Sequence, residues 1–408
     1  MKILVLNSGS SSQKSSLYEI GENLPDDPPA PLWEGKIEWH DEVAKAEVKN
    51  AGVVEKHQVQ VSTRVGAVEH LLGTLWDGKT RAVTSPAEID VVGHRVVHGG
   101  PKYAESVRVT SEVKAGIAGV SAFAPLHNRA ELEGMEVIEK VLGAIPQVAV
   151  FDTGFHRKMP PAAAVYPGPY QWFESGIHRY GFHGINHQYC AARAAQLLRR
   201  DLNSLKLVTC HLGNGCSLAA IQEGHSIDTT MGFTPLEGLM MGTRSGSVDP
   251  GILTYLMREH RLQAHEIDDV LNKESGLLGI SGVSGDMREV LESMKQGHSR
   301  SKLAFDIYVH RLQSGIGAMV AVLGGIDVLV FTAGVGENSA QVRAAACKRL
   351  SFLGLKLDDA ANARCHPDGG IAAPDSAVRV LVIRAQEDWA IAKECWRLMG
   401  ASPSAALT

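Results

Sequence analysis

The feature that most constrains the fold is a pattern that occurs three times. Each copy is a short run of β-branched and apolar residues that ends in a turn rich in glycine, serine or asparagine, at residues 3–12, 207–217 and 328–338. Such a turn places backbone N–H groups and hydroxyls at a strand end, a geometry that binds phosphate oxygens. A single copy is equally well an ordinary tight turn. Three copies in one chain favour a nucleotide-binding protein.

Short strand-like runs alternate along the chain with longer segments of 3.6-residue periodicity, which predicts an α/β fold with parallel strands. The predicted strands are residues 2–6, 89–97, 147–151, 205–212, 327–332 and 378–383. The predicted helices are residues 129–142, 187–200, 303–323, 337–350 and 387–398. The proline-rich stretch 21–35 is predicted to be a surface loop or a hairpin connection, because proline does not fit a regular element there.

Length and composition exclude several classes of protein. A chain of 408 residues predicts two domains. Hydrophobic residues at 44% and charged residues at 21% exclude collagen-like, disordered and disulfide-scaffold proteins. The formal net charge is −5 and no block of Lys or Arg occurs, so we expect neither a nucleic-acid nor a membrane partner. The first apolar run, residues 3–6, is too short for a signal sequence or a membrane span, and the six cysteines form no C-x-x-C pair. We therefore expect a soluble, cytoplasmic protein with buried thiols.

Two motifs match known patterns without the structural context that the patterns require. Residues 73–80 satisfy G-x-x-x-x-G-K-[ST], but they follow an amphipathic helix over 65–76 instead of a buried strand. We interpret this P-loop match as accidental. His183 and His187 have the i, i+4 spacing of a zinc pair, yet no metalloprotease glutamate accompanies them and Gly184 weakens a helix there. Zinc stays an alternative at this pair.

Three residues stand out as candidates for handling an anion. Arg244 lies in the glycine-dense segment 232–250, where a guanidinium can make a forked contact to carboxylate or phosphate. Arg95 lies at a predicted strand end, and a structural ion pair is its alternative explanation. Asp152 follows the strand 147–151, the usual place for a carboxylate that handles metal or phosphate, although it could equally cap a helix.

Taken together, these motifs resemble the acetate kinases, the acetokinase group of the actin-like, sugar-kinase and heat-shock ATPase fold. The matching segments are residues 7–14, 93–100, 125–128, 151–153, 180–184, 211–215, 228–250, 281–288, 331–338 and Glu387. The resemblance implies an α/β fold of two actin-like (ribonuclease H-like) domains flanking a nucleotide cleft. The N-terminal domain would comprise residues 1–152 plus 385–408, and the C-terminal nucleotide-binding domain residues 153–384.

The resemblance also implies an activity: reversible, direct in-line transfer of the γ-phosphoryl group of ATP to acetate, which gives acetyl phosphate and ADP. It implies Mg²⁺, with Mn²⁺ as a substitute, and a homodimer formed through the C-terminal half. The implied catalytic residues are Arg95, Asp152, His183 and Arg244, and His127 matches a family active-site histidine. The acetate pocket would comprise Arg95, Val97, Leu126, Phe182 and Pro235. The nucleotide-binding residues would be Ser10, Ser12, Lys14, His211, Leu212, Gly213, Asn214, Gly215, Asp286, Met287, Arg288, Gly334, Val335, Gly336, Glu337 and Asn338, and Asn7 and Glu387 would lie around the metal.

Elementary electrostatics explains why such a reaction needs cations. A carboxylic acid is already ionised at pH 7, so a general base has no proton to remove. The obstacle is repulsion between the acid anion and the polyphosphate, about 4 kcal/mol for two unit charges ~4 Å apart at an effective dielectric constant near 20. Two arginines, a histidine and Mg²⁺ would offset this repulsion. We therefore interpret Asp152 as a positioning residue and not as a base.

Two alternatives remain at this point. A propionate or butyrate kinase of the same family would differ in the room around the acid, and one methylene changes binding by only ~1–3 kcal/mol. An actin-like or chaperone-like ATPase would need no acid pocket. The sequence also departs from the family pattern at Ser15-Ser16, Ile185-Asn186, Met287 and Gln386-Glu387-Asp388, where the common motif is Asn-Glu-Glu.

Overall fold

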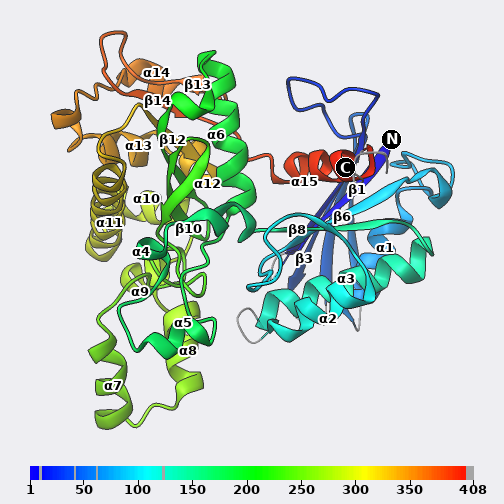
Figure 1. The fold of residues 1–408 in the computed structure, drawn as a ribbon, viewed down its shortest axis with the longest axis horizontal. Coiled ribbons are helices and arrows are strands. Elements are labelled where there is room, and N and C mark those ends of the chain that lie inside the picture. Colours follow the sequence, from blue (N-terminus) through cyan, green and yellow to red (C-terminus); the bar gives the residue numbers. More distant parts are fainter. Residues whose placement is uncertain (9–11, 41–42, 61–62, 122–124, 401–408) are drawn as a thin grey trace, which may run out of the picture. The chain divides into compact units, whose positions relative to one another are not determined.

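The computed structural model describes residues 1–8, 12–40, 43–60, 63–121 and 125–400. Contacts between Cα atoms divide the chain into two units. Unit 1 comprises Met1–Gly154 with the C-terminal segment from Gln386, and unit 2 comprises Phe155–Ala385. Each unit contains one mixed sheet with helices packed against it (Figure 1). No helix of the described residues is long and apolar enough to cross a membrane.

The sheet of unit 1 has the strand order β5-β4-β3-β2-β1-β6-β8-β7. Its strands are β1 (Lys2–Ser8), β2 (Ser12–Glu19), β3 (Trp33–His40), β4 (Val43–Asn50), β5 (Val53–Gln60), β6 (Val91–Val96), β7 (Val107–Arg108) and β8 (Gln147–Phe151). β1, β6 and β8 run parallel, whereas β1 to β5 form an antiparallel meander. The carboxyl ends of the three parallel strands therefore meet at one edge of the sheet.

Helices cover both faces of this sheet, as Figure 1 shows. They are α1 (Arg64–Gly73), α2 (Ser111–Gly119), α3 (Pro125–Leu142) and α15 (Glu387–Gly400), with a 3-10 turn, η1 (Pro86–Glu88). On β1, Leu4 and Leu6 belong to a core cluster with Leu71 of α1 and Ile138 of α3. α15 packs against β1 and β6. The C-terminal helix thus belongs to the same folded unit as the N-terminal strand.

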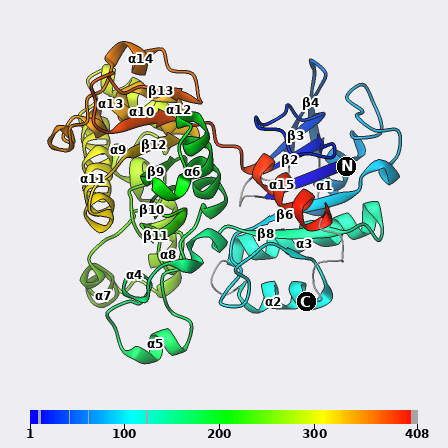
Figure 2. The ribbon, with the colours of Figure 1, turned by 45° about the horizontal axis from the view of Figure 1, so that its top comes forward.

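The sheet of unit 2 has the order β11-β10-β9-β12-β14-β13. Its strands are β9 (Lys206–Leu212), β10 (Cys216–Gln222), β11 (His225–Thr229), β12 (Val328–Thr332), β13 (Gly369–Gly370) and β14 (Arg379–Val382). β9, β12 and β14 run parallel, and β10 and β11 continue antiparallel from β9. Helices α6 (Gly184–Leu198) and α11 (Ser299–Leu323) lie on opposite sides of these strands (Figure 2).

The remaining helices of unit 2 are short. They are η3 (Gly154–Lys158), α4 (Pro161–Ala164), α5 (Tyr170–Glu174), η4 (Leu202–Ser204), α7 (Pro250–Glu259), α8 (Ala264–Lys273), α9 (Gly276–Ser281), α10 (Met287–Lys295), α12 (Ala333–Asn338), α13 (Ala340–Cys347), η5 (Ser351–Leu353) and α14 (Asp359–Ala363). α12 follows β12 directly and α10 packs on α11.

The two units share one topology. β3-β2-β1-β6-β8 in unit 1 and β11-β10-β9-β12-β14 in unit 2 both place an antiparallel hairpin beside three parallel strands. The predicted α/β class with two similar units is confirmed. Each unit brings the carboxyl ends of its parallel strands to one sheet edge, the usual location of ligand-binding groups in α/β sheets.

Several elements differ from the sequence prediction. The meander β3–β5 was not predicted, although the alternation of charged and apolar side chains in residues 33–60 is the pattern of half-buried strands. The predicted loop 21–35 ends at Leu32, because β3 begins at Trp33. α6 begins at Gly184 instead of residue 187, and the predicted helix 337–350 is divided into α12 and α13 at Ser339. Five cysteines are buried as expected, but Cys365 is partly exposed.

The packing of α15 on β6 leads to a test of unit 1. A Cβ on Gly93 would lie 2.6 Å from Sγ of Cys395 and 2.7 Å from Cγ2 of Ile391, both in α15. Gly93→Ala should therefore lower the free energy of unfolding by about 1–3 kcal/mol through overpacking. Gly134→Ala in α3, where a Cβ meets nothing within 4 Å, is the matched control. Urea unfolding followed by tryptophan fluorescence measures the stability of both variants. A Gly93→Ala midpoint equal to that of the parent chain would contradict the packing of α15 on β6.

Candidate functional site

Two of the predicted catalytic residues in unit 1 form an ion pair. Arg95 lies near the carboxyl end of β6, and Asp152 follows the neighbouring parallel strand β8. Nε of Arg95 donates to Oδ2 of Asp152 at 3.0 Å, and Nη2 donates to the same oxygen. The Asp152 side chain is 1% exposed and that of Arg95 14%. The ion pair considered as an alternative for Arg95 is therefore present, and its partner is the other candidate residue.

The surroundings of Arg95 stabilise its charged form. Burial by itself lowers the pKa of Arg95, but the carboxylates of Asp152 and Glu387 raise it, and the net shift is upward. The guanidinium is thus a permanent cation in a region with little access to water. Hydrogen bonds from such a cation to anionic ligands are stronger than those in bulk solvent.

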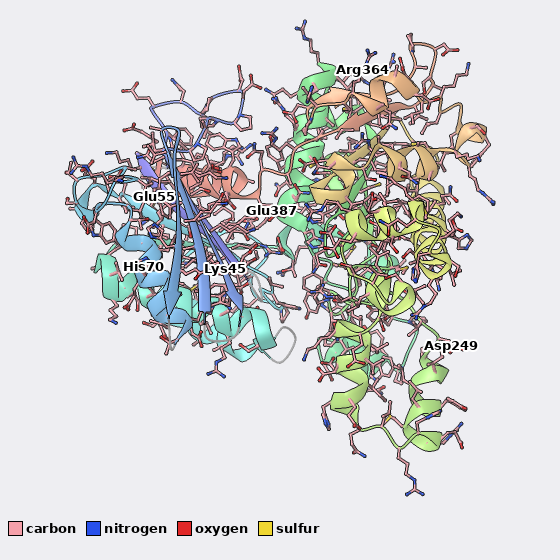
Figure 3. All side chains as sticks on the ribbon, turned by 180° about the vertical axis from the view of Figure 1, so that it is seen from behind. Lys45, Glu55, His70, Asp249, Arg364 and Glu387 are labelled. Carbon is pink, nitrogen blue, oxygen red and sulfur yellow. The ribbon has the colours of Figure 1, made fainter. Side chains whose placement is uncertain are left out.

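The two predicted metal-site residues also lie together. Asn7 is near the end of β1, and Glu387 is the first residue of α15 (Figure 3). Nδ2 of Asn7 donates to Oε2 of Glu387 at 3.1 Å and to Oδ1 of Asp388 at 2.9 Å. Ser16 on β2 donates to the other oxygen of Asp388 at 2.8 Å. Ser16 and Asp388, which both depart from the family pattern, therefore contact each other, and burial raises the pKa of Asp388.

A buried glutamate that the sequence analysis missed lies beside this group. Both carboxylate oxygens of Glu131, on α3, accept the backbone N–H of Val97, at 3.1 and 3.2 Å. Burial raises the pKa of Glu131 to about 8, although Arg95 and the Val97 N–H act in the opposite direction. The signal was present in the sequence. Residues 128, 131, 135 and 138 share one helix face at 3.6-residue spacing, and all four are buried, so the glutamate occupies a core position.

The other predicted residues of unit 1 are placed as follows. Val97 is 3% exposed, just after β6. Ser12 and Lys14 lie on β2, with Lys14 paired to Asn7 across the hairpin and exposed. Ser10 lies outside the described residues. Leu126 and His127 belong to α3, but their side chains lie outside the described part of the chain.

In unit 2, two predicted residues stack ring on ring. His183 is the N-cap of α6 and has a left-handed backbone (φ 57°), and His211 lies on β9. Their ring centroids are 3.9 Å apart with an interplanar angle of 10°. Nδ1 of His183 and Nε2 of His187 each lie 2.8 Å from Oγ of Ser217, so the i, i+4 histidine pair shares one serine. Within the described part of the chain, no group of three His, Cys, Asp or Glu side chains is arranged to hold a metal ion.

Arg244 lies beside the same group. Its Nη1 donates to the carbonyl of Pro235 at 3.1 Å. A Cβ on Gly215 would lie 3.4 Å from Nε2 of His183 and 3.6 Å from Nη1 of Arg244. The turn at Gly215 is therefore flanked by an imidazole and a guanidinium, and glycine keeps the space between them open. Phe182, which precedes His183, is 1% exposed.

Backbone segments predicted to hold the nucleotide converge on the β9–β10 turn, which follows Leu212. A Cβ on Gly213 would lie 3.7 Å from Cβ of Ala333, the first residue of α12. A Cβ on Gly242 would lie 2.2 Å from Oδ1 of Asn214 and 2.9 Å from the carbonyl of Gly285. Three of the predicted segments, residues 211–215, 286–288 and 334–338, are thus brought to neighbouring positions in unit 2.

The side chains of these segments have varied surroundings. Asp286 caps α10 and forms an ion pair with the exposed Arg288, whereas Met287 is 2% exposed. Glu337 accepts the N–H of Ala385 at 2.8 Å, and burial raises its pKa. Gly334 and Asn338 are exposed and joined by a 2.8 Å hydrogen bond from Nδ2 of Asn338; Val335 is partly buried and Gly336 is buried.

Comparison with known proteins agrees with this arrangement. The sequence matches the profile of the acetokinase family over residues 2–393. The chain belongs to the acetokinase family. A protein named acetate kinase from Cyanothece sp. is 60% identical over 402 residues, which covers 98% of both chains. The family predicted from the motifs is confirmed.

Two solved structures of the family are similar over almost the whole chain. A Porphyromonas gingivalis acetate kinase has a TM-score of 0.89 and 42% identity, and covers 98% of this chain and 99% of its own. A Francisella tularensis propionate kinase has a TM-score of 0.88 and 37% identity, and covers 96% of this chain and 98% of its own. Acetokinase-family chains with different named acceptors therefore share this fold.

Glu131 gives a pH-dependent test of this acetokinase-family site. Its pKa is raised, so between about pH 4.5 and pH 8 the folded chain holds a proton that the unfolded chain has lost. Stability from this group is present at low pH and falls as pH rises through that window, by up to about 1.4 kcal/mol per pH unit. Glu131→Gln should therefore become more stable than the parent chain between pH 6 and pH 9.

Urea unfolding across this pH range measures the effect, since five of the six tryptophans (Trp33, Trp39, Trp76, Trp389 and Trp396) belong to unit 1. Glu133→Gln, two residues along α3 and with a side chain 34% exposed, is the matched control. Parallel stability curves for Glu131→Gln and the parent chain would show that Glu131 is ionised in the folded state.

Proposed function

We propose that this chain transfers the γ-phosphoryl group of ATP to acetate, reversibly and in line, to give acetyl phosphate and ADP. The full-length similarity to a chain named acetate kinase, 60% identical over 98% of each sequence, carries the proposal. Cationic and hydrogen-bonding groups at the two sets of strand ends provide the chemistry. An ATPase that only drives partner binding would have no use for the two arginines.

In this proposal the chain acts mainly by offsetting charge. The acetate oxygen is already anionic and attacks the γ-phosphorus, while the bond to the β-phosphate oxygen breaks and ADP leaves. Arg95 and Arg244 balance the acid anion and the migrating phosphoryl group, and His183 donates a hydrogen bond as charge develops. Asp152 holds Arg95 by two contacts to one oxygen, which suits a positioning role.

The nucleotide is assigned to unit 2 in this proposal. The β9–β10 turn of residues 213–215 lies at a strand end, next to the start of α12, a position where phosphate groups commonly bind. Residues 286–288 and 334–338 would lie around the nucleoside. Lys14, Ser12 and Ser10 of unit 1 are proposed to contact phosphates.

Mg²⁺ is the ion that the donor set of unit 1 fits. Mg²⁺ in phosphotransferases is commonly held by one or two carboxylates together with substrate phosphates and water. Glu387 and Asp388 provide two carboxylates within 3.1 Å of one amide nitrogen, that of Asn7. Asn7 and Glu387 are the proposed residues around the ion, and Mn²⁺ has the same preference for oxygen. When bound, the ion would neutralise charge on the β- and γ-phosphates.

A homodimer through unit 2 is part of the proposal. α5 exposes Tyr170, Trp172 and Phe173, and α7 exposes Ile252, Tyr255 and Met257. No residue of α7 is buried in the single chain. Exposed apolar groups of this size mark surfaces that are covered by a partner. Such a homodimer would act in the cytoplasm on small molecules only.

A hydroxamate assay tests the proposed reaction. Incubation with MgATP, acetate and hydroxylamine should accumulate acetohydroxamate, because an acyl phosphate is trapped by the amine. Propionate and butyrate in parallel arms measure the acceptor preference, with acetate expected to give the highest kcat/KM. ATP hydrolysis without any hydroxamate would instead indicate an ATPase of the actin or chaperone class.

Arginine variants test the assignment of the site. Arg95→Ala and Arg244→Ala should each lower kcat by at least about 100-fold, as removal of transition-state charge stabilisation does, while ATP still binds. Arg129→Ala, a surface arginine 82% exposed, is the matched control and should keep full activity. Calorimetric titration measures ATP binding by all three variants. Unaltered turnover of Arg95→Ala or Arg244→Ala would remove that residue from the mechanism.

A further inference from the structure

Asn186, which departs from the family pattern, makes a directional contact to His211. Asn186 is on α6 and fully buried. Its Nδ2 lies 2.8 Å from Nδ1 of His211 and 3.5 Å from Oγ1 of Thr332, the residue beside His211 on the neighbouring strand β12. Its Oδ1 accepts the thiol of Cys190 at 3.6 Å. The two ends of the amide therefore have different partners.

This contact determines where His211 carries its proton. An amide nitrogen can only donate, so Nδ1 of His211 must accept. A neutral imidazole that accepts at Nδ1 carries its hydrogen on Nε2. A Cβ on Gly213 would lie 3.5 Å from that Nε2, so the N–H is located at the β9–β10 turn. A second proton on the ring would have to displace the Asn186 amide.

The stacked partner ring has a different neighbour. Nδ1 of His183 lies 2.8 Å from Oγ of Ser217, and a hydroxyl can either donate or accept. The same hydroxyl contacts Nε2 of His187, whose Nδ1 lies 2.7 Å from Oγ1 of Thr209. Burial lowers the pKa of His187 well below its usual range, so His187 stays neutral. Ser217 can therefore reorient with the protonation state of His183, whereas the Asn186 amide would have to turn over and lose its contacts to Thr332 and Cys190.

Charge repulsion allows at most one ring of the stacked pair to be cationic. The rings of His183 and His211 are 3.9 Å apart, so a positive charge on both would be strongly unfavourable. The other titratable groups near His211 are His187, with its ring 6.2 Å away, the Cys190 thiol behind Asn186, and Arg244 beside His183. Arg244 is a permanent cation that adds to the repulsion.

We propose that Asn186 is a positioning residue that keeps His211 neutral with its proton on Nε2. His211 is then a permanent hydrogen-bond donor at the β9–β10 turn, and His183 is the only ring of the stacked pair that can take a positive charge. That this donor binds a nucleotide phosphate rests on the proposed function. The protonation state of His211 does not.

The direct test is ¹⁵N NMR of the imidazoles in the full chain labelled at histidine, with His211→Gln used to assign the resonances. From pH 6 to pH 9, His211 should show a pyridine-type Nδ1 and a protonated Nε2, without titrating. A proton on Nδ1, or a cationic His211 at pH 7, would overturn the proposal. This readout needs no activity, so it stands even if the chain transfers no phosphoryl group.

Asn186→Asp tests the consequence for binding. A carboxylate of the same shape accepts from Nδ1 and favours the cation, so the pKa of His211 should rise by about 1–3 units. Above that pKa, Nε2 would present a lone pair to phosphate. The KM for ATP of Asn186→Asp relative to the parent chain should therefore rise about tenfold between pH 6 and pH 9. Asn203→Asp, an exposed change to the same residue type in unit 2, should leave this ratio flat.

If Asn186→Asp is folded and its KM for ATP relative to the parent chain does not change with pH, the proposal is contradicted. Asn186→Ser provides a milder change, since a hydroxyl can accept or donate, and His211 should then titrate in the NMR experiment. If Asn186→Ser left His211 neutral with its proton on Nε2 throughout, Asn186 would not be the residue that determines the tautomer. If the parent chain formed no hydroxamate but its His211 were neutral with the proton on Nε2, only the proposed function would be overturned.

Discussion

The arrangement of unit 1 depends on one buried ion pair. Arg95 and Asp152 come from neighbouring parallel strands whose ends are level, because the N–H of Asp152 donates to the carbonyl of Val96 at 2.9 Å. A carboxylate that is 1% exposed is stable only when it is paired. The pair therefore positions the guanidinium, and the guanidinium in turn offsets the charge of the buried carboxylate. Removing either partner would leave an uncompensated buried charge, so the two side chains are best understood as one functional group.

Unit 2 has the same topology, but different functional groups lie at its strand ends. There two imidazoles, a guanidinium and a glycine turn lie at the strand ends. His183 and His211 are held at their inner nitrogens by Ser217 and Asn186, so their outer nitrogens are directed to the turn. Neutral donors in a closely packed site can be oriented without the desolvation cost of a full charge. One fold thus supplies a fixed charge in unit 1 and oriented donors in unit 2.

Much of this could be predicted from the sequence, because strand-end motifs are local. Arg95, Asp152, His183 and Arg244 were identified from glycine-rich segments and from the family resemblance. The structure pairs Arg95 with Asp152, and it places His183 and Arg244 beside the turn at Gly215. The meander of residues 33–60 was missed because the predicted strands rest on continuous apolar runs, whereas the meander alternates apolar with charged residues. The contacts of Glu131, Asn186 and Ser217 were not predictable, since each depends on which helix or strand packs behind the site. Glu131 alone carried a signal, as a charge on a core face of a helix.

Asp152 is proposed to act only through Arg95, and a double-mutant cycle on kcat/KM for acetate is the sharpest test of that role. Arg95→Ala, Asp152→Asn and the combined variant would be compared with the parent chain under identical MgATP saturation. If Asp152 only positions the guanidinium, adding Asp152→Asn to Arg95→Ala should cause no further loss. If the loss of kcat/KM in the combined variant equalled the product of the two separate losses, Asp152 would contribute independently of Arg95. That result would contradict its positioning role.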